Sequence, residues 1–314
     1  MKYITNEEIA KLITPKKAIE LVEQSFRLKN NAILPTKTSI HINDINYFNT
    51  MPAIIPDLEI MGVKVIDRYI NRNIKVDGEI FIYDYNNGNL KYMLDAFWIT
   101  TARTGAVCAL AIKYLAKSNF STIGIMGLGA TGTASLACIL EDNKNKPLQI
   151  NLLRYKNHCE KIIENFKHYK NATFNIIDNI EELIKSSNVF VSCITNTTSL
   201  LAKPEWFKEG TLIVPIHNKG FQNCDQIFDK VFGDDTSHIS GFKYFDKFKY
   251  FAELPDVITG KNKGRTSDKE RIISYNLGLV IHDLVYSKYI IDNLKSKSTE
   301  ISLSDKNNFV FKMK

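Results

Sequence analysis

The pattern of hydrophobic and polar positions changes near residue 121. Beyond that point, short apolar runs typical of β-strands alternate with longer segments that lack glycine and proline and have helical spacing. The predicted strands span 121–126, 148–153, 172–177, 188–194, 210–216 and 230–234, and the predicted helices span 130–142, 156–168 and 179–186. This strand–helix alternation predicts an α/β fold with a Rossmann-type, doubly wound parallel sheet and helices on both faces.

The residues before 121 follow another pattern. An apolar stripe at helical spacing predicts one helix over 6–29, and a second helix is expected over 96–116. Between them, strand-like runs are predicted at 38–43, 60–67, 78–84 and 89–93, with Pro52 and Pro56 as interruptions and Asn87-Gly88 as a hairpin signal. The tail over 266–293 is also predicted to be helical, with capping residues at its start.

The stretch "GIMGLGATGTAS" (124–135) contains a G-x-G-x-x-G pattern between a predicted strand and a predicted helix. In a dinucleotide site, Gly127 makes the tight turn, Gly129 lets the backbone approach a pyrophosphate, and Gly132 allows close helix–strand packing. A merely structural glycine turn is the alternative. The strand–turn–helix context favours the dinucleotide interpretation.

The residue after the second predicted strand bears on the choice of dinucleotide. An Asp or Glu there accepts hydrogen bonds from the ribose 2′-hydroxyl of NAD. Here Arg154 takes that place, and a guanidinium would pair with a 2′-phosphate. The sequence therefore favours NADP (NADPH) over NAD, with an ordinary surface arginine as the alternative.

Composition narrows the function classes. The net charge is +7, but the basic residues are dispersed, and the aromatic-lysine stretch 242–251 is typical of a packed surface segment, so no nucleic-acid partner is expected. No apolar stretch has the length of a membrane span and the first residues form no signal peptide, so no membrane partner is expected. Five scattered cysteines without a C-x-x-C favour reduced thiols in the cytoplasm and no metal site.

Several motifs in order along the chain resemble the ornithine cyclodeaminase/mu-crystallin family. The segment that leads into the glycine loop, "ITTARTGAVCALAIKYLA" (99–116), carries the resemblance most clearly. The others are "NTMPAI" (49–54), "GVKVID" (62–67), "EIFIYDYNNG" (79–88), "TNTTSLLAKPEWFKEGT" (195–211) and "GRTSDKERIISYNLGLVIHDL" (264–284). The resemblance extends over nearly the whole chain.

The resemblance implies a domain plan and an assembly. Residues 117–265 are expected to form the NAD(P)-binding Rossmann domain. Residues 1–116 are expected to be the first part of a discontinuous α+β substrate and dimerisation domain, to which 266–314 return as a C-terminal helix. The family also implies a homodimer and a small amino-acid or imine substrate with a carboxylate.

The resemblance assigns roles to individual residues. Arg103 would bind the substrate carboxylate, for which a guanidinium is suited by its two parallel donors. Lys64 would polarise the reacting C=O or C=N or move a proton, and burial next to Arg103 would depress its pKa. The expected nucleotide contacts are Thr104, Gly127, Gly129, Ala130, Thr131, Gly132 and Thr195. A surface position for Lys64, and loop-capping roles for the threonines, are the structural alternatives.

Two departures from the family pattern affect the expected reaction. Lys37 stands where the family has the arginine of Pro-x-Arg, so only a point charge remains. Lys219 falls at the position of the aspartate that handles the substrate amine in cyclodeaminases, with the wrong sign. Asp77 could stand in as the acid. Lys37, Lys219 and His217 together hint at a substrate with more than one anionic group.

Three functions remain open from the sequence. The favoured one is an NADPH-dependent oxidoreductase that reduces an imine or oxo acid, or oxidises the matching amino acid, held by its carboxylate. The second is an ornithine or lysine cyclodeaminase or an opine-like synthase that joins amino acids. The third is a non-catalytic NADP-binding protein, which would need neither Lys64 nor Arg103. The substrate itself is not specified by the sequence.

Overall fold

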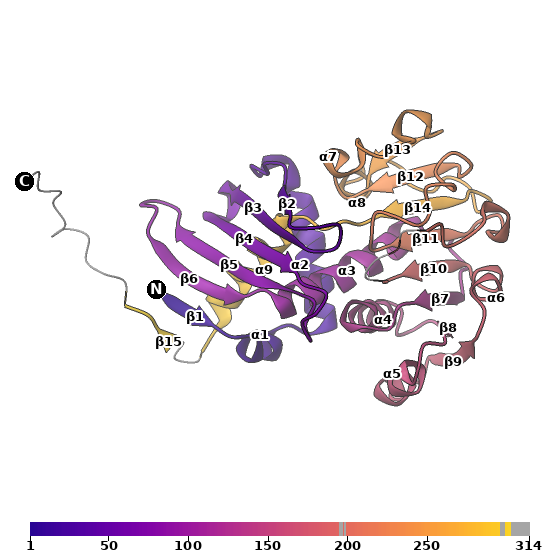
Figure 1. Cartoon of the computed structure of the whole chain (residues 1–314), viewed down its shortest axis with the longest axis horizontal. Coiled ribbons are helices and arrows are strands. Elements are labelled where there is room, and N and C mark those ends of the chain that lie inside the picture. Colours follow the sequence, from indigo (N-terminus) through magenta and orange to yellow (C-terminus); the bar gives the residue numbers. More distant parts are fainter. Residues whose placement is uncertain (195–196, 198, 296–298, 303–314) are drawn as a thin grey trace, which may run out of the picture.

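The computed structural model describes residues 1–194, 197, 199–295 and 299–302, and Figure 1 shows its course. In space, two β-sheets lie at opposite ends of the described structure, and a long helix, α3 (Phe97–Leu115), runs between them. Residues 1–95 and 299–300 contribute the strands of one sheet, and residues 122–275 contribute those of the other. The first sheet contains both antiparallel and parallel strand pairs, and the second contains only parallel pairs.

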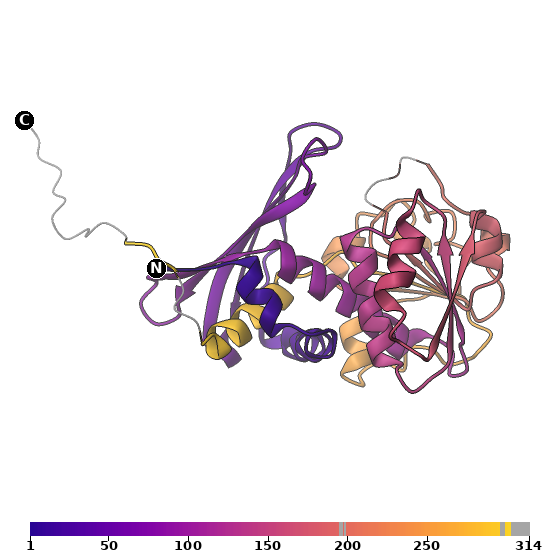
Figure 2. The same cartoon turned by 90° about the horizontal axis from the view of Figure 1, so that it is seen from below.

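The second sheet, called the parallel sheet, contains the six predicted strands and two further ones, β13 (Phe251–Glu253) and β14 (Ile272–Tyr275). Its strands are β7 (Thr122–Met126), β8 (Leu148–Leu153), β9 (Ala172–Ile177), β10 (Val189–Ser192), β11 (Leu212–Pro215), β12 (Lys230–Gly233), β13 (Phe251–Glu253) and β14 (Ile272–Tyr275). They lie in the order β13-β12-β14-β11-β10-β7-β8-β9, and each neighbouring pair is parallel. The doubly wound sheet predicted from the alternation is confirmed, with helices on both faces in Figure 2.

The connections of the parallel sheet include three helices close to their predicted bounds. They are α4 (Ala130–Asp142), α5 (His158–Phe166) and α6 (Ile180–Lys185). Later connections hold α7 (Thr236–Ile239), α8 (Leu254–Ile258) and the 3-10 turns at Pro204–Trp206 and Phe245–Lys247. The phenylalanines of the aromatic-lysine stretch pack against the core of this sheet, which confirms the packed segment expected there.

The helix predicted over 266–293 is wrong in its first half. Residues 266–271 form no helix, and β14 enters the parallel sheet between β11 and β12. Its four residues are fully buried, because a central strand of a parallel sheet is covered on both faces. Only after Gly278 does the helix α9 (Val280–Asn293) begin. The capping pattern at 266–270 therefore comes before the strand β14 and not before a helix.

The first sheet, called the mixed sheet, contains more strands than the sequence predicts. They are β1 (Lys2–Ile4), β2 (Thr38–His41), β3 (Tyr47–Ile55), β4 (Ile60–Arg68), β5 (Val76–Asp84), β6 (Leu90–Asp95) and β15 (Thr299–Glu300). The order is β15-β1-β6-β5-β4-β3-β2, and the predicted hairpin at Asn87-Gly88 joins β5 to β6. The strand β3 was missed because it contains Pro52.

Proline is tolerated inside β3 for a local reason. Ile54 N–H donates to Ile33 on one side of the strand, and Pro52, two residues earlier, has its missing N–H on that same side. The neighbouring strand β2 pairs only with residues 47–50 of β3. Pro52 therefore removes no ladder hydrogen bond.

The predicted helix over 6–29 is two helices in the structure. They are α1 (Asn6–Leu12) and α2 (Pro15–Leu28), and a 3-10 turn, Lys29–Asn31, follows α2. Thr14 caps α2 through the Lys17 N–H, and Pro15 occupies its first position. A proline at that place ends the preceding helix and starts a new one.

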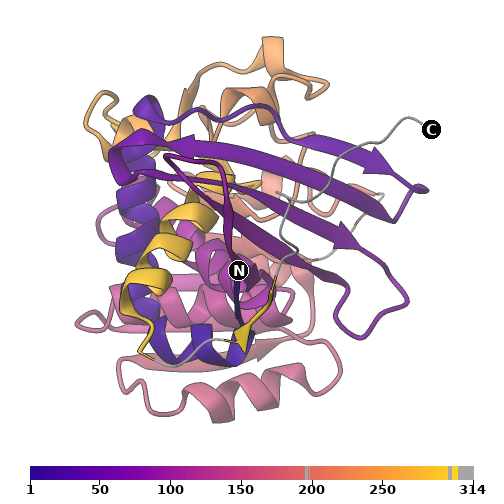
Figure 3. The same ribbon diagram turned by 90° about the vertical axis from the view of Figure 1, so that its left-hand side faces the viewer.

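One face of the mixed sheet is covered by helices and the other is not. The helices α1, α2 and α9 lie on one face in Figures 2 and 3, so that the C-terminal helix packs beside the N-terminal ones. Along β4 the burial alternates, with Gly62, Lys64 and Ile66 buried beneath these helices and Val63 and Val65 half-exposed on the far face. In the described residues, no helix covers that far face.

In the described ranges, no helix combines the length and the apolar character that a membrane-spanning helix needs.

Candidate functional site

The glycine loop between β7 and α4 has the shape that the motif predicts. Gly127 has φ +90°, and a Cβ placed there would lie 2.6 Å from the carbonyl carbon of Cys193 at the end of β10. A Cβ at Gly132 would lie 1.9 Å from the Gly127 oxygen. A Cβ at Gly129 would meet nothing within 4 Å. Two of the glycines are therefore required by packing, and the third leaves open space beside the loop.

The N-terminus of α4 faces that open space. Gly129 precedes the helix, Gly129 and Ala130 are exposed, and Thr131 is half-exposed. The first N–H groups of any helix lack acceptors within the helix, and they carry the positive end of its dipole. An exposed, glycine-lined helix N-terminus fits the pyrophosphate of a dinucleotide. Thr195, the remaining expected nucleotide contact in this crevice, lies outside the described residues.

Lys64 is fully buried in the middle of β4. Its Nζ donates to Thr100 Oγ1 of α3 at 2.7 Å and to Asp283 Oδ1 of α9 at 2.6 Å. Burial lowers the pKa of Lys64 to about 8, and the nearby Arg103 adds to this, while Asp283 opposes it. The depressed pKa predicted for this lysine is therefore confirmed, and it places a titratable ammonium close to working pH.

Arg103 lies on α3, close to Lys64 and nearly as buried. Its side chain is 9% exposed, and its Nε lies 3.9 Å from Asp283 Oδ1. Nε is buried and has no hydrogen-bond partner among the described residues. On one side the guanidinium lies against Gly278, where a Cβ would be 2.1 Å from Nη1. A buried guanidinium with an unused donor can accept a carboxylate ligand.

The carboxylate candidate and the glycine loop are joined by a close helix contact. Gly105, two residues after Arg103, packs against α4, where its Cβ would be 2.5 Å from the backbone carbon of Ala134. Ala134 is one helical turn from Ala130, or about 6 Å along the axis. Thr104 is buried beside it and donates to the Thr100 carbonyl at 2.6 Å. This contact packs α3, the helix that carries Arg103, closely against α4.

Lys37 is near the same place. It is half-buried, burial lowers its pKa, and the charges of Asp234 and Arg103 act on it in opposite directions. The structure therefore brings Lys64 and Arg103 together, and Lys37 lies within range of the charge of Arg103. Of these three, Lys64 is bound to a carboxylate directly.

Asp77 and Lys219 are not part of this group. Asp77 lies on β5 opposite Asp67 of β4, and side chains alternate along a strand, so Asp77 is on the far face from Lys64. Lys219 is exposed in the loop after β11, where its carbonyl accepts a hydrogen bond from His217 Nδ1 at 2.6 Å. Burial lowers the pKa of His217, which disfavours its cationic form. Of the three cations that suggested a substrate with several anionic groups, only Lys37 remains near Arg103.

Arg154 lies at the carboxyl end of β8, as the sequence predicts, and it already has partners. Its Nε is 2.5 Å from Asp178 Oδ1 and its Nη1 is 3.1 Å from Glu160 Oε1. All three side chains are substantially exposed. A phosphate at this position would compete with two carboxylates for the guanidinium.

The sequence reasoning missed two polar side chains of the site. Thr100 and Asp283 hold the ammonium of Lys64, and Asp283 Oδ2 is buried without a partner among the described residues. A signal for Asp283 is present in the sequence: it is the only Asp, Glu, Lys or Arg between Arg271 and Lys288. Acidic residues are rarely fully buried unless they are paired, so such a position indicates a partner.

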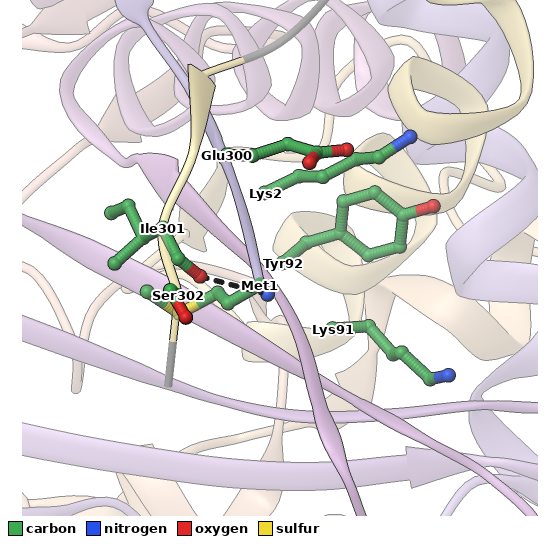
Figure 4. A pocket seen from close by; sticks show the side chains of 7 residues that line it. All are labelled: Met1, Lys2, Lys91, Tyr92, Glu300, Ile301 and Ser302. Carbon is green, nitrogen blue, oxygen red and sulfur yellow. Dashed lines mark hydrogen bonds between the residues drawn. The ribbon is translucent and has the colours of Figure 1, made fainter. Parts of the chain in front are cut away.

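A hollow elsewhere on the molecule is separate from this group of residues. A hollow of about 850 Å³ lies at the edge of the mixed sheet (Figure 4), and it is lined by Met1, Lys2, Lys91, Tyr92, Glu300, Ile301 and Ser302. It contains none of the site residues named above. Among the described residues, no three His, Cys, Asp or Glu side chains are grouped as metal ligands.

Comparisons with known proteins agree on one family. A model of the ornithine cyclodeaminase/mu-crystallin family matches residues 2–298. A Δ¹-pyrroline-2-carboxylate reductase of Bacillus cereus is 25% identical, over 93% of this chain and 96% of that protein.

Two solved structures have the same fold. The Thermococcus litoralis Δ¹-pyrroline-2-carboxylate reductase, in complex with NADH and L-proline, superposes with a TM-score of 0.82 at 22% identity, covering 93% of this chain and 97% of the other. An archaeal alanine dehydrogenase dimer with bound NAD has a TM-score of 0.84 at 23% identity, covering 97% and 99%.

Proposed function

This chain belongs to the ornithine cyclodeaminase/mu-crystallin family, and we propose that it is a nicotinamide-dependent oxidoreductase that interconverts an imine or oxo acid and the matching amino acid. The observation that supports this most is the buried ammonium of Lys64, with a pKa of about 8, beside Arg103. Burying a lysine is costly, and a protein that only bound a nucleotide would not need it.

Each site residue has a role in this proposal. Arg103 holds the substrate carboxylate with the donors that the protein leaves unused, and Lys37 adds a point charge. Lys64 holds a proton at Nζ and transfers it to the substrate heteroatom, or removes one in the reverse direction. Asp283 and Thr100 fix the position of that Nζ. A nicotinamide dinucleotide held at Gly127–Gly132 would supply or take the hydride.

Ring-closing deamination is less compatible with this arrangement. A cyclodeaminase needs an acid for the second amine of its substrate. Asp77 lies on the other face of the mixed sheet, and Lys219 is an exposed cation. The acids closest to Arg103 already bind Lys64 or the backbone of Gly278. These positions favour the reductase or dehydrogenase.

The reaction is tested by a substrate screen. NADPH and NADH oxidation are followed with cyclic imines, and with oxo acids in the presence of amines, and NADP and NAD reduction are followed with amino acids. We expect turnover of at least one carboxylate-bearing imine or oxo acid. Turnover of diamino acids to cyclic amino acids and ammonia, with no net oxidation of the nucleotide, would replace the proposal by cyclodeamination.

We propose NADP(H) as the preferred cofactor, because Arg154 replaces the acidic residue that binds the ribose of NAD. One charge-assisted contact to an exposed phosphate corresponds to roughly tenfold in affinity. NADPH should therefore bind about tenfold more tightly than NADH in isothermal titration, and Arg154→Gln should remove the difference by weakening NADPH alone.

A matched variant separates this effect from general damage at the surface. Asp178 competes for the guanidinium of Arg154, so Asp178→Asn should leave NADPH binding intact or tighten it. Equal affinity of the wild-type protein for NADH and NADPH, or a preference for NADH, would contradict the assignment.

We propose that two copies assemble through the uncovered face of the mixed sheet. A hollow of about 300 Å³ on this sheet has an apolar lining, made by Ile33, Pro35, Pro52, Ala53, Ile54, Met61, Gly62, Val63 and Tyr83. An exposed apolar sheet face is a surface for association. The family relationship supports a second copy of this chain as the partner.

Light scattering should therefore report a dimer, or a multiple of it, at micromolar concentration. Val63→Asp puts a charge on the uncovered face and should shift the protein towards a monomer. Ile227→Asp is the control, since Ile227 is an exposed apolar residue outside the mixed sheet. A monomeric wild-type protein, or equal behaviour of the two variants, would argue against this interface.

A cytoplasmic location is also part of the proposal. The five cysteines are free, and four of them are buried. Unpaired thiols are typical of a reducing compartment, where pyridine nucleotides and amino acids are also available. Fractionation of the source cells checks it.

A further inference from the structure

Asp234 lies directly after β12 and is fully buried. Its Oδ2 accepts the N–H of Gly278 at 2.5 Å, and its Oδ1 lies 3.3 Å from His238 Nδ1. Its own N–H donates to the carbonyl of Tyr275, and its carbonyl accepts from Lys29 Nζ at 3.0 Å. The carboxylate is therefore held rigidly in place, between the end of β12 and the connection from β14 to α9.

Gly278 links this carboxylate to Arg103. It has φ +92°, a conformation that side chains other than glycine's rarely adopt. The guanidinium of Arg103 occupies the space where a Cβ would be, at 2.1 Å from Nη1 and 2.8 Å from Cζ. The nearest acid recorded for Arg103 is Asp283, at 3.9 Å. The backbone of Gly278 is thus a wall against which the guanidinium rests.

The same carboxylate acts on Lys37. The charge of Asp234 raises the pKa of that lysine, against the effects of burial and of Arg103. The charge of this buried acid therefore affects Lys37, and its hydrogen bond to Gly278 links it to Arg103. Neither Lys37 nor Arg103 has a direct ion pair below 3.9 Å among the described residues.

We propose that Asp234 is a positioning residue: it fixes the Gly278 amide against the guanidinium of Arg103. The inference rests on the proposed function, in which Arg103 binds a substrate carboxylate. Asp234 itself touches no substrate. It acts through the wall that Gly278 forms.

The sign of the effect separates positioning from charge. A negative charge near two cations opposes a carboxylate ligand, so its removal alone would lower KM. Loss of positioning does the opposite, because a misplaced guanidinium binds the carboxylate poorly, and a shift of about 1 Å can cost roughly 10²-fold. The proposal therefore predicts that Asp234→Ala raises KM, although it removes a repulsive charge.

The experiment compares four variants with the best substrate from the screen. Asp234→Ala should raise KM roughly 10- to 100-fold with a smaller change in kcat. Asp234→Asn keeps an acceptor for the Gly278 N–H and should raise KM less. Gly278→Ala fills the space of the guanidinium and should reproduce the effect of Asp234→Ala. Asp235→Asn removes the neighbouring charge, which pairs with Lys29, and should leave KM unchanged.

A second readout needs no substrate. Arginine side-chain Nε signals are recorded on ¹⁵N-labelled protein, and the Arg103 signal is identified by its loss in Arg103→Lys. We expect this signal to shift in Asp234→Ala and Gly278→Ala, and to stay in place in Asp235→Asn. An unmoved signal in Asp234→Ala, or a KM that falls or stays constant in that variant, overturns the inference.

Two different outcomes separate the loss of the positioning role of Asp234 from the loss of the proposed reaction. If Arg103→Ala raises KM but Asp234→Ala does not, only the positioning role is lost. If no carboxylate substrate turns over while the Arg103 signal still shifts, the proposed reaction is lost and the link from Asp234 to Arg103 stands.

Discussion

Alanine in place of Lys64 is expected to lower kcat by roughly 10²–10⁴-fold while KM changes little. The reason is that Nζ transfers its proton only as the reaction proceeds, so its loss affects the transition state more than the bound substrate. Steady-state kinetics with the substrate from the screen measure both constants. NADPH affinity should stay unchanged, because Lys64 is not part of the Gly127–Gly132 loop.

The pH profile provides a second test of Lys64. Its pKa is lowered to about 8, so the ammonium dominates below that value and the free amine above it. Reduction needs the protonated form, so kcat/KM for reduction should fall as the pH rises through about 8. Oxidation of the amino acid needs the free amine and should rise through the same pH. Both changes in rate through about pH 8 should be absent in Lys64→Ala.

A control variant addresses the stability of the substituted protein. Removing Lys64 alone leaves the buried Asp283 without its close partner and with only the Arg103 guanidinium at 3.9 Å, and breaking a buried pair can cost roughly 3–5 kcal/mol. Lys64→Ala combined with Asp283→Asn removes both charges and should restore the folded protein without restoring kcat. A single variant with nearly normal kcat would exclude Lys64 from the chemistry.

The second large effect is expected at Arg103. Arg103→Ala should raise KM roughly 10²–10³-fold, because two charge-assisted hydrogen bonds to the substrate carboxylate are lost. Some loss of kcat should accompany it, from poorer orientation of the substrate. The measurement is the same kinetic assay, extended to substrate concentrations high enough to define KM.

Arg103→Lys provides the matched comparison. A lysine keeps the charge but not the fork of parallel donors, so its KM should lie between those of the wild-type protein and Arg103→Ala. Nucleotide affinity should be constant throughout the series. A KM that is insensitive to both substitutions would place the carboxylate elsewhere in the site, with Lys37 as the next cation to test.

Much of the fold followed from local signals in the sequence. The helix α4 and the strands β8 and β9 have the predicted bounds, because each combines a distinct hydrophobic period with clear turn residues. The errors lie where tertiary structure overrides a local signal. Pro52 favoured an interruption where the strand β3 forms. A capping pattern favoured a helix where β14 enters the parallel sheet.

The site divides in a similar way. The glycine loop was found from its spacing between a predicted strand and helix, and Lys64 and Arg103 were found through the resemblance to the family. Asp77 was named only because an acid was needed, and the strand register places it on the far face of the mixed sheet. Asp283 and Asp234 escaped notice because contacts between distant segments bring them into the site. Asp283 binds Lys64, 219 residues away, and Asp234 binds Gly278, which lies against Arg103.

The sequence by itself determined the alternation of strands and helices, the glycine loop and the family, since these depend on residues close together in the chain. Only the tertiary structure decided what surrounds Lys64 and Arg103. Their burial, the ion pair with Asp283 and the wall at Gly278 arise where β4, α3 and α9 meet. Burial and charge pairing depend on which distant segments are packed together, and no local pattern encodes that packing.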